Sequence, residues 1–488
     1  MELNNVKDVL VVGAGAAGLA LAIDLSRRGV SVQVVEQSAQ LFPGSRGKGI
    51  QPRTMEVLED LGVVGAMLAA GGPPPVPMVW QDGERKGERQ MSDESAPSEG
   101  EPYPGPRLVP QWRTQEILYD RLVELGGSVT FGTALTGFTQ DSEGVTAELS
   151  GGGGAAGVAG GRTVRARYLV AADGGRSTVR RLLGIGMTGE TVDPKPIVVA
   201  DLRIPTLDRL NWHMFPGANG SFFTLCPLPG TDDFQLSASV ESGSAPDTSH
   251  SGIRTLVAAR THLAAEDVTE VLWASDFRPR TGLAHRFREG RIFLAGDAAH
   301  IHSPAGAQGL NTSIQDAYNL GWKLGQVLLG GAPEALLDTY EAERRPVAEQ
   351  VLGLSTRVHR GEEQRGAATR QLGLGYRNGP LSTGAAGALQ AGDRAPDGRL
   401  ADGTRIFEGL RGPHFTLLMA GTDAEAPPGE TDQLHVRRLP ANTPYGKGLF
   451  LIRPDGYVGW AGEEATGLAQ WLEAVGGPGS AQAAFSRD

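Results

Sequence analysis

The chain of 488 residues is predicted to adopt an α/β fold in which a Rossmann-like domain is interleaved with a β-sheet domain, and a smaller α/β domain follows. A glycine-rich motif at residues 13–18 stands between an apolar run and a helical pattern. Two further apolar runs end at Asp173 and Asp297, and residues 187–284 carry repeated short strand patterns. These observations predict a parallel sheet with a ligand site at the carboxyl ends of its strands, and a second, mostly antiparallel sheet.

The composition is typical of a globular protein with two or three domains, with 21% charged and 40% hydrophobic residues. A net charge of −11 argues against nucleic acid or an anionic membrane surface as the main partner. No apolar run reaches the roughly 18 residues that span a bilayer, and Glu2 argues against a signal peptide. Cys226 is the only cysteine, which excludes an internal disulfide and fits the reducing cytoplasm. It is interpreted as a small buried apolar residue.

Residues 8–36 are predicted to form a strand, a tight turn, a helix and a second strand. Gly13 would allow the turn, Gly15 would let the backbone approach a pyrophosphate, and Gly18 would let helix and strand pack closely. The helix N-terminus then offers unpaired N–H groups to phosphates, and Glu36, at the end of the second strand, is placed to accept ribose hydroxyls. A glycine turn without ligand is the alternative. The motif fits FAD or NAD equally.

Asp173-Gly174 and Gly296-Asp297 follow buried strands at the edge where an open α/β sheet binds its ligand. The alternative is an aspartate that caps a helix. A long amphipathic helix is expected from about residue 314, followed by a second helix over 336–358 with a break near Pro346.

The proline- and glycine-rich stretch 70–107 suggests an excursion into the second domain, and Gly151–Gly161 is interpreted as a loop between two hairpin strands. The predicted organisation is a dinucleotide domain (1–73, 108–186 and 285–335), a substrate domain (74–107 and 187–284), a helical segment and linker (336–391), and a C-terminal domain (392–488).

Five segments together resemble a known family: Ser45–Glu56, Gln111 with the helix after it, Asp173-Gly174, the run from Gly296 to Leu324, and Arg453–Val458. They are similar to the single-component (class A) FAD-dependent aromatic hydroxylases, the group of para-hydroxybenzoate hydroxylase. The likeness is greatest to the three-domain members that oxidise phenols and aromatic polyketides, and it covers nearly the whole chain. It implies a thioredoxin-like C-terminal domain, which here has no cysteine for thiol chemistry.

The resemblance implies an FAD-dependent monooxygenase of secondary metabolism that consumes NADPH or NADH and O₂. Reduced flavin would form a C4a-hydroperoxide that an electron-rich aromatic substrate attacks. No second Gly-x-Gly-x-x-Gly motif links a strand to a helix, which agrees with the lack of a nicotinamide domain in this family. The alternatives are Baeyer–Villiger oxidation or epoxidation in the same fold, a flavin-dependent reductase, and a flavin-binding scaffold without activity. A monomer or homodimer is expected.

The resemblance also assigns residues. Glu36 would hold the adenosine ribose, Ala17 and Gln111 the pyrophosphate and ribityl chain, and Asp297 the ribityl hydroxyls, while the backbone of Leu310 and Asn311 would face the flavin pyrimidine. The full predicted cofactor set is Gly13, Gly15, Ala16, Ala17, Gly18, Glu36, Gln37, Arg46, Gln111, Asp173, Asp297, Pro304, Gly309, Leu310 and Asn311.

Arg46 and His213 are the predicted catalytic residues. Arg46 lies in the loop that lines the mobile flavin in the family, and His213 would face a phenolic substrate, with a buried sheet histidine as the alternative. The histidines at 285, 300 and 302 do not have metal-ligand spacing, so no metal is expected. Trp80, Trp212 and Phe223 are assigned to the core, with stacking on a substrate as the alternative.

Overall fold

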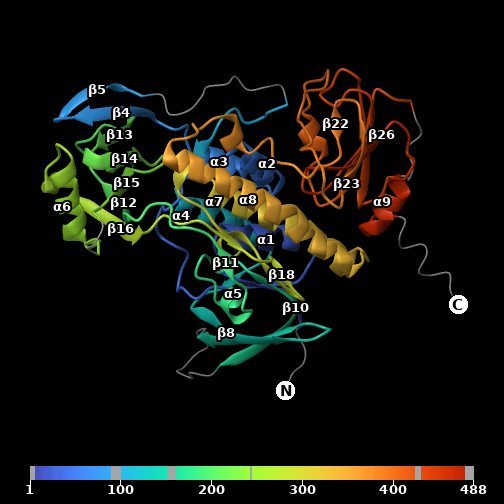
Figure 1. Ribbon diagram of the computed structural model, residues 1–488. Helices are drawn as coiled ribbons and strands as arrows, with labels where there is room; N and C mark the ends of the chain where they lie inside the picture. The colour runs from blue at the N-terminus through green and yellow to red at the C-terminus, as the bar shows by residue number, and fades with distance from the viewer. Residues whose placement is uncertain (1–5, 90–99, 152–160, 242–244, 424–429, 479–488) are drawn as a thin grey trace.

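The computed structural model describes residues 6–89, 100–151, 161–241, 245–423 and 430–478 (Figure 1). Most of the predicted loop 151–161 and parts of the predicted substrate and C-terminal domains therefore lie outside the described residues. Three sheets dominate the described chain. In Figure 1 the sheet with α6 (His250–Arg260) lies at the left, the C-terminal sheet lies at the upper right, and the long helices α7 (Gly309–Leu329) and α8 (Asp338–Arg360) run between them.

The central sheet has the strand order β18-β19-β10-β1-β2-β7, and the β8–β9 hairpin joins it beside β10. Its parallel core brings together segments far apart in the chain, because Val11 pairs with Val34 on one side and with Val170 on the other. The strands are β1 (Lys7–Val12), β2 (Val32–Val35), β7 (Val129–Thr130), β8 (Thr133–Gln140), β9 (Val145–Gly151), β10 (Arg162–Ala171), β18 (Arg288–Glu289) and β19 (Ile292–Leu294).

Helices cover the central sheet because its strands are apolar on both faces. Helix α1 (Ala16–Arg27) packs on α7 and on α4 (Gln111–Glu124), and α2 (Pro52–Asp60) packs on α7 and on α3 (Val64–Ala70). Short strands tie the loops together: β3 (Gly49–Ile50) pairs with β6 (Arg107–Leu108), and β17 (Gly282–Ala284) pairs with β11 (Met187–Thr188) and β20 (His300–Ile301). None of the helices in the described part of the chain is long and apolar enough for a bilayer crossing.

The second sheet has seven strands in the order β16-β12-β15-β14-β13-β4-β5. Alternate residues of each strand point to opposite faces, and one face packs on α6 through side chains such as Leu202, Leu225 and Ile253. The other face is turned toward the central domain. The strands are β4 (Val76–Gln81), β5 (Glu84–Glu88), β12 (Ile197–Arg203), β13 (Asn211–Pro216), β14 (Phe222–Pro227), β15 (Asp233–Ser239) and β16 (Glu270–Phe277).

The C-terminal sheet has the order β22-β21-β26-β25-β23-β24, with parallel and antiparallel pairs as in a thioredoxin-like domain. One of its faces packs on α7, where Trp322 contacts Phe415 edge to face. The elements are β21 (Thr383–Ala386), β22 (Leu389–Gln390), β23 (Phe415–Ala420), β24 (Leu434–Leu439), β25 (Gly448–Ile452), β26 (Val458–Gly462) and α9 (Leu468–Ala474).

Two sequence-based expectations for this region are wrong. Helix α8 continues through Pro346 without a break, because buried side chains on both sides of the proline, among them Arg344 and Val347, hold it against the core. The glycine-rich segment 361–391 is not a free linker. It contributes β21 and β22 to the C-terminal sheet, and its buried Gln371 donates a hydrogen bond to Gln308.

Candidate active site

The glycine turn after β1 has the geometry of a phosphate site. Gly13 has φ +106°, and a Cβ there would lie 2.4 Å from the Ala172 carbonyl oxygen. A Cβ at Gly18 would lie 2.0 Å from the Gly13 carbonyl oxygen, so both positions require glycine. A Cβ at Gly15 would instead meet no atom within 4 Å. Helix α1 starts beside this open space without a side-chain cap, so its first N–H groups remain available to phosphate oxygens.

Glu36 stands next to this turn at the end of β2. Its carboxylate accepts hydrogen bonds from the backbone N–H groups of Ala14 at 2.9 Å and Ser38 at 2.8 Å. These two bonds fix its orientation and leave further lone pairs for ribose hydroxyls. Gln37, the next predicted residue, is exposed.

Asp297 lies on a short turn that packs in space between helix α1 and the start of helix α7. Gly296 begins this turn (Gly296–Ala298), and a Cβ there would lie 3.2 Å from the Ala17 side chain and 2.9 Å from Ser313 Oγ. The Asp297 side chain is exposed, yet enough protein surrounds it for desolvation to raise its pKa, which His300 and Arg46 partly offset. A carboxylate in this place suits hydroxyl groups of a ribityl chain.

The start of α7 is a second uncapped helix N-terminus. The tight turn before it contains Gly306 with φ +79° and Ala307 with φ +54°, a strained conformation for a residue with a side chain. The buried Asn311 amide donates to the carbonyls of Ala307 at 2.6 Å and Gly49 at 2.9 Å, and accepts from the Gln51 N–H at 2.8 Å. Only the backbone of Asn311 is therefore left for a ligand.

The loop over residues 37–48 brings these parts together. The Gly47 N–H donates to Gln111 Oε1 at 2.9 Å, and a Cβ at Gly47 would lie 3.9 Å from Leu310 Cδ1. Arg46 crosses to the second sheet, where its Nη2 donates to Ser275 Oγ at 3.0 Å. Burial lowers the pKa of Arg46, and the nearby Asp297 opposes this. Arg46 therefore connects the aspartate of the central domain with the sheet of the second domain.

Asp173 has the capping role that was the alternative interpretation. Its Oδ2 accepts from the N–H groups of Thr178 at 2.7 Å and Val179 at 3.2 Å, at the start of α5 (Thr178–Leu182). Its Oδ1 is buried without a hydrogen-bond partner among the described residues. One acceptor atom is therefore left for a ligand. Pro304, also predicted here, is exposed at the start of the turn before α7.

His213 does not lie with the other predicted residues. It is fully buried on the α6 face of the second sheet, beside Phe234. Its Nδ1 accepts from Trp80 Nε1 at 3.0 Å, and its Nε2 contacts the Asp208 carbonyl oxygen at 2.9 Å, so both ring nitrogens are engaged. Burial lowers its pKa. This placement matches the buried sheet histidine that was the alternative.

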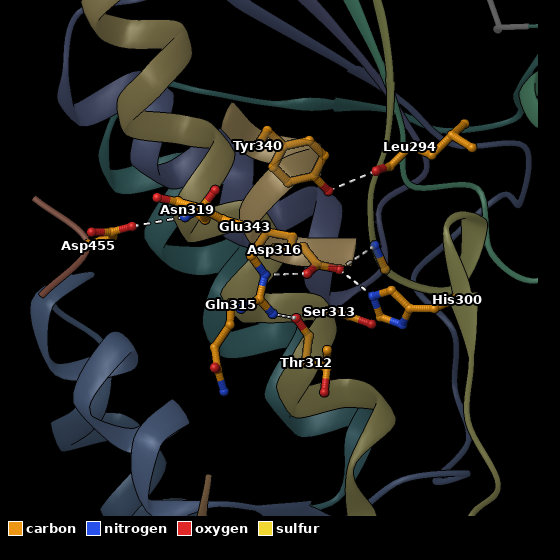
Figure 2. Close-up of polar contacts among 12 residues, drawn as sticks. Leu294, His300, Thr312, Ser313, Gln315, Asp316, Asn319, Tyr340, Glu343 and Asp455 are labelled. Atoms are coloured by element: carbon orange, nitrogen blue, oxygen red, sulfur yellow. Dashed lines mark hydrogen bonds and ion pairs between the residues drawn. The ribbon is translucent and has the colours of Figure 1, made fainter. Parts of the chain in front are cut away.

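A buried polar network that sequence reasoning missed holds the Gly296 turn (Figure 2). Asp316 on α7 accepts from the Gly296 N–H at 3.1 Å, from His300 Nε2 at 2.5 Å and from Arg344 Nε at 2.7 Å. Burial acts to raise the pKa of Asp316, but His300 and Arg344 outweigh it and lower the pKa. His302 Nε2 lies 2.8 Å from His300 Nδ1 and extends the network. The only sequence signal was the spacing of His300 and Asp316 within one motif.

The same helix binds the C-terminal domain. Asp455 Oδ2 accepts from Asn319 Nδ2 and from Trp322 Nε1, each at 3.1 Å, and Figure 2 shows the first contact. Glu343 accepts from Lys323 Nζ at 2.7 Å and from Arg453 Nη1 at 2.6 Å, with all three side chains fully buried. Part of the motif that resembled a flavin signature therefore serves domain docking.

The residues fit FAD. Two uncapped helix N-termini, an open space at Gly15, and the carboxylates of Glu36 and Asp297 can serve a pyrophosphate with a ribose on one side and a ribityl chain on the other. Across the described ranges, no three His, Cys, Asp or Glu side chains gather as a metal site requires.

Comparison with known proteins agrees with this geometry. An FAD binding domain family matches residues 7–355, and an aromatic-ring hydroxylase C-terminal family matches residues 389–478. A flavin-dependent monooxygenase of Mycobacteroides abscessus is 43% identical over 96% of this chain and 99% of its own length. The 12-dehydrotetracycline 5-monooxygenase/anhydrotetracycline 6-monooxygenase of Streptomyces rimosus is 34% identical over 96% of this chain and 98% of its own length.

Among solved structures, a ternary complex of aklavinone-11 hydroxylase with FAD and aklavinone superimposes with a TM-score of 0.81 at 28% identity, covering 97% of this chain and 99% of that chain. The fold and the order of the two family domains thus agree over nearly the whole length. The chain belongs to the FAD-dependent monooxygenases in which an FAD binding domain is followed by an aromatic-ring hydroxylase C-terminal domain.

Proposed function

We propose that this FAD-dependent monooxygenase hydroxylates a planar aromatic substrate, phenolic or polyketide-like, with NADPH or NADH as reductant and O₂ as oxidant. The observation that carries the proposal is the position of the loop 37–48. Gly47 of this loop binds Gln111 among the predicted cofactor residues, and Arg46 binds the face of the second sheet opposite to α6. Relatives named for tetracycline intermediates, pentachlorophenol and aklavinone support an aromatic substrate of this kind.

Bound FAD, once reduced, supplies the activated oxygen for this reaction. The side chains of the protein bind and position. Glu36 and the start of α1 would hold the adenosine diphosphate part, and Asp297 with Gln111 the ribityl part. The N–H groups at the start of α7 would face the flavin pyrimidine and favour its anionic form. The free sheet face would orient the substrate and keep water from the reacting atoms.

Arg46 is proposed to control access of the nicotinamide. No second glycine motif offers a nicotinamide domain, so the co-substrate must dock transiently at the flavin. Arg46 spans the two domains beside Asp297, where a moving flavin would pass. We further propose a cytoplasmic enzyme, monomer or homodimer, which fits the single, buried and free Cys226. Size-exclusion chromatography with light scattering would measure the oligomeric state.

A panel of phenols, naphthols and hydroxyanthraquinones tests the activity. Each compound is scored by stimulated NADPH or NADH oxidation, by hydrogen peroxide release and by the product mass. Stimulated oxidation with a product heavier by one oxygen supports the proposal. Reduction of a double bond in the substrate without uptake of O₂ would instead identify a reductase.

A further inference from the structure

The free face of the second sheet carries an unusual row of side chains. Neighbouring strands place Asp201 beside Gln235 and Gln235 beside Cys226, on the face opposite to α6. Trp212, on the next strand, points to the same side because its neighbour His213 points to α6. The loop 37–48 covers this row, and Gln235 Nε2 donates to the Ser45 carbonyl oxygen. The row therefore lies where the loop 37–48 packs on the second sheet.

Two cations lie close to the Trp212 ring. Lys48 Nζ from the loop 37–48 lies 4.7 Å from the ring centroid, and the Arg365 guanidinium, from the segment after α8, lies 5.9 Å from it. All three side chains are half-buried. We call Lys48, Trp212 and Arg365 the tryptophan site.

The tryptophan site has donors without acceptors. Within the described ranges, neither Lys48 nor Arg365 forms an ion pair, and the Arg365 guanidinium has no hydrogen-bond partner. Lys48 donates to Gln235 Oε1, which leaves two of its three N–H groups free. The Trp212 Nε1–H is buried and has no acceptor among the described residues. Three kinds of donor thus meet with no anion to satisfy them.

The other ionisable groups near this site do not neutralise it fully. Asp201 is buried, and this burial raises its pKa to about 7 although the neighbouring Ser45 and Lys48 oppose the shift. Burial also raises the pKa of the Cys226 thiol to about 11, so this group is neutral. Arg209 adds a further positive charge near Cys226, with its donors bound to backbone carbonyls. Burial lowers the pKa values of Lys48 and Arg365, because both cations have lost water that an anion could replace.

We propose that Lys48, Arg365 and the Trp212 indole N–H bind an oxyanion of the substrate, so that the enzyme selects aromatic compounds with an ionised phenol, enol or carboxylate. This inference rests on the proposed function, since it names the substrate class of the same site. Gly47, next to Lys48, contacts Gln111 and lies beside Leu310 at the cofactor residues. An oxyanion at the tryptophan site would therefore orient the aromatic ring relative to the flavin.

The test uses the FAD-loaded full chain and alizarin, a planar dihydroxyanthraquinone whose absorption changes when its phenol ionises. A cationic site should lower the pKa of bound alizarin by at least one unit, which equals a tenfold preference for the anion. Lys48→Met and Arg365→Met should each weaken binding of the alizarin anion about tenfold or more and reduce the shift. Arg365→Lys should retain most of it. Affinity for the dimethyl ether of alizarin should not change.

Matched controls are Lys86→Met on β5 and Arg437→Met on β24, whose side chains form exposed ion pairs far along the chain from this site. The inference is overturned if alizarin and its dimethyl ether bind equally well, if both site variants keep the full pKa shift, or if neither alizarin nor 2-naphthoate binds. FAD content and the substrate panel are measured on the same preparations. Hydroxylation of aromatic compounds without any preference for anions would reject this inference alone, whereas a protein without FAD or oxygenation would reject the proposed function.

Discussion

Glu36 combines two tasks at the residue scale, since it orders the glycine turn and keeps acceptor capacity for a ribose. We expect Glu36→Ala to weaken FAD binding by roughly 1.5–3 kcal/mol, the usual contribution of hydrogen bonds to a charged group. Titration of apoprotein with FAD, followed by flavin fluorescence, gives the dissociation constant. Glu349→Ala on the exposed side of α8 is the control and should bind FAD like the natural protein.

Arg46 is the residue whose loss should affect reduction rather than cofactor binding. Arg46→Ala should lower the substrate-stimulated rate of flavin reduction several-fold while FAD stays bound, because the contact between the loop and Ser275 is lost. Stopped-flow absorbance under anaerobic conditions measures this rate. Ser275→Ala removes only the acceptor and should have a smaller effect. Unchanged reduction kinetics in Arg46→Ala would reject the proposed role.

Asp201 predicts a pH dependence of stability. Its pKa is about 7 in the folded protein against roughly 3.9 in an unfolded chain, so the folded state binds this proton more tightly. Protonated Asp201 contributes to the free energy of unfolding in full below about pH 4. This contribution is lost as the pH rises to 7, at up to roughly 1.4 kcal/mol per pH unit.

Asp201→Asn should remove this loss, so that the variant gains stability relative to the natural protein between pH 4 and 7. Urea unfolding at several pH values gives the difference. The exposed Asp232→Asn should show no such trend, and parallel pH profiles for natural protein and Asp201→Asn would contradict the argument.

The local glycine motif predicted Gly15 and Glu36, and the family resemblance added Gln111. The structure brings all three to the region around the glycine turn and the loop 37–48, and their binding of FAD stays a prediction. It misplaced His213, because alternation along a strand defines two faces but not which one meets the cofactor. It assigned Trp212 to the core and passed over Lys48 and Arg365, because their meeting depends on tertiary packing between segments far apart in the chain.

At the scale of elements, α7 acts as a shared support. One part of it holds the Gly296 turn through Asp316, and a later part binds Asp455 of the C-terminal domain through Asn319 and Trp322. The sequence predicted this helix but not its second partner, because the acceptors Glu343 and Asp455 lie on other segments. Deletion of residues 392–488 would expose Trp322 and the buried Lys323–Glu343 ion pair to solvent. A point variant at the domain contact therefore tests the docking with less disturbance of the rest of the protein.

Arg453→Met should destabilise the protein by roughly 3–5 kcal/mol, because it leaves the carboxylates of Glu343 and Asp455 buried with one cation fewer. Denaturant unfolding followed by tryptophan fluorescence measures the change. Arg377→Met, which breaks an exposed ion pair with Asp393, is the control and should change stability by less than about 1 kcal/mol. FAD binding to folded Arg453→Met should persist.

At the scale of the whole molecule, the proposed reaction makes a prediction about atoms. The oxygen added to the product should come from O₂ and not from water, because the proposed reaction uses O₂ activated at the reduced flavin. Reaction under ¹⁸O₂ should give a product heavier by two mass units than reaction under ¹⁶O₂. Label taken from H₂¹⁸O under ordinary O₂, after correction for exchange of carbonyl oxygens, would contradict the mechanism.

The fold class and the order of the sheets along the chain could be predicted from the sequence, because each depends on local periodicity and glycine motifs. The course of the chain through Pro346 and the integration of residues 361–391 were not, since packing overrode the local signals there.

The order of strands in the central sheet has a consequence for biosynthesis. Strand β1 pairs with β10, and β10 with β19, so the sheet is incomplete until Leu294 has been translated. At about 5–20 residues per second, a ribosome needs roughly 15–60 s to reach that point. Meanwhile the glycine turn has no Asp297 beside it and the nascent chain cannot form the complete FAD site. The cofactor is thus expected to associate late, and a ribosome stalled before β19 should carry a chain that protease digests readily.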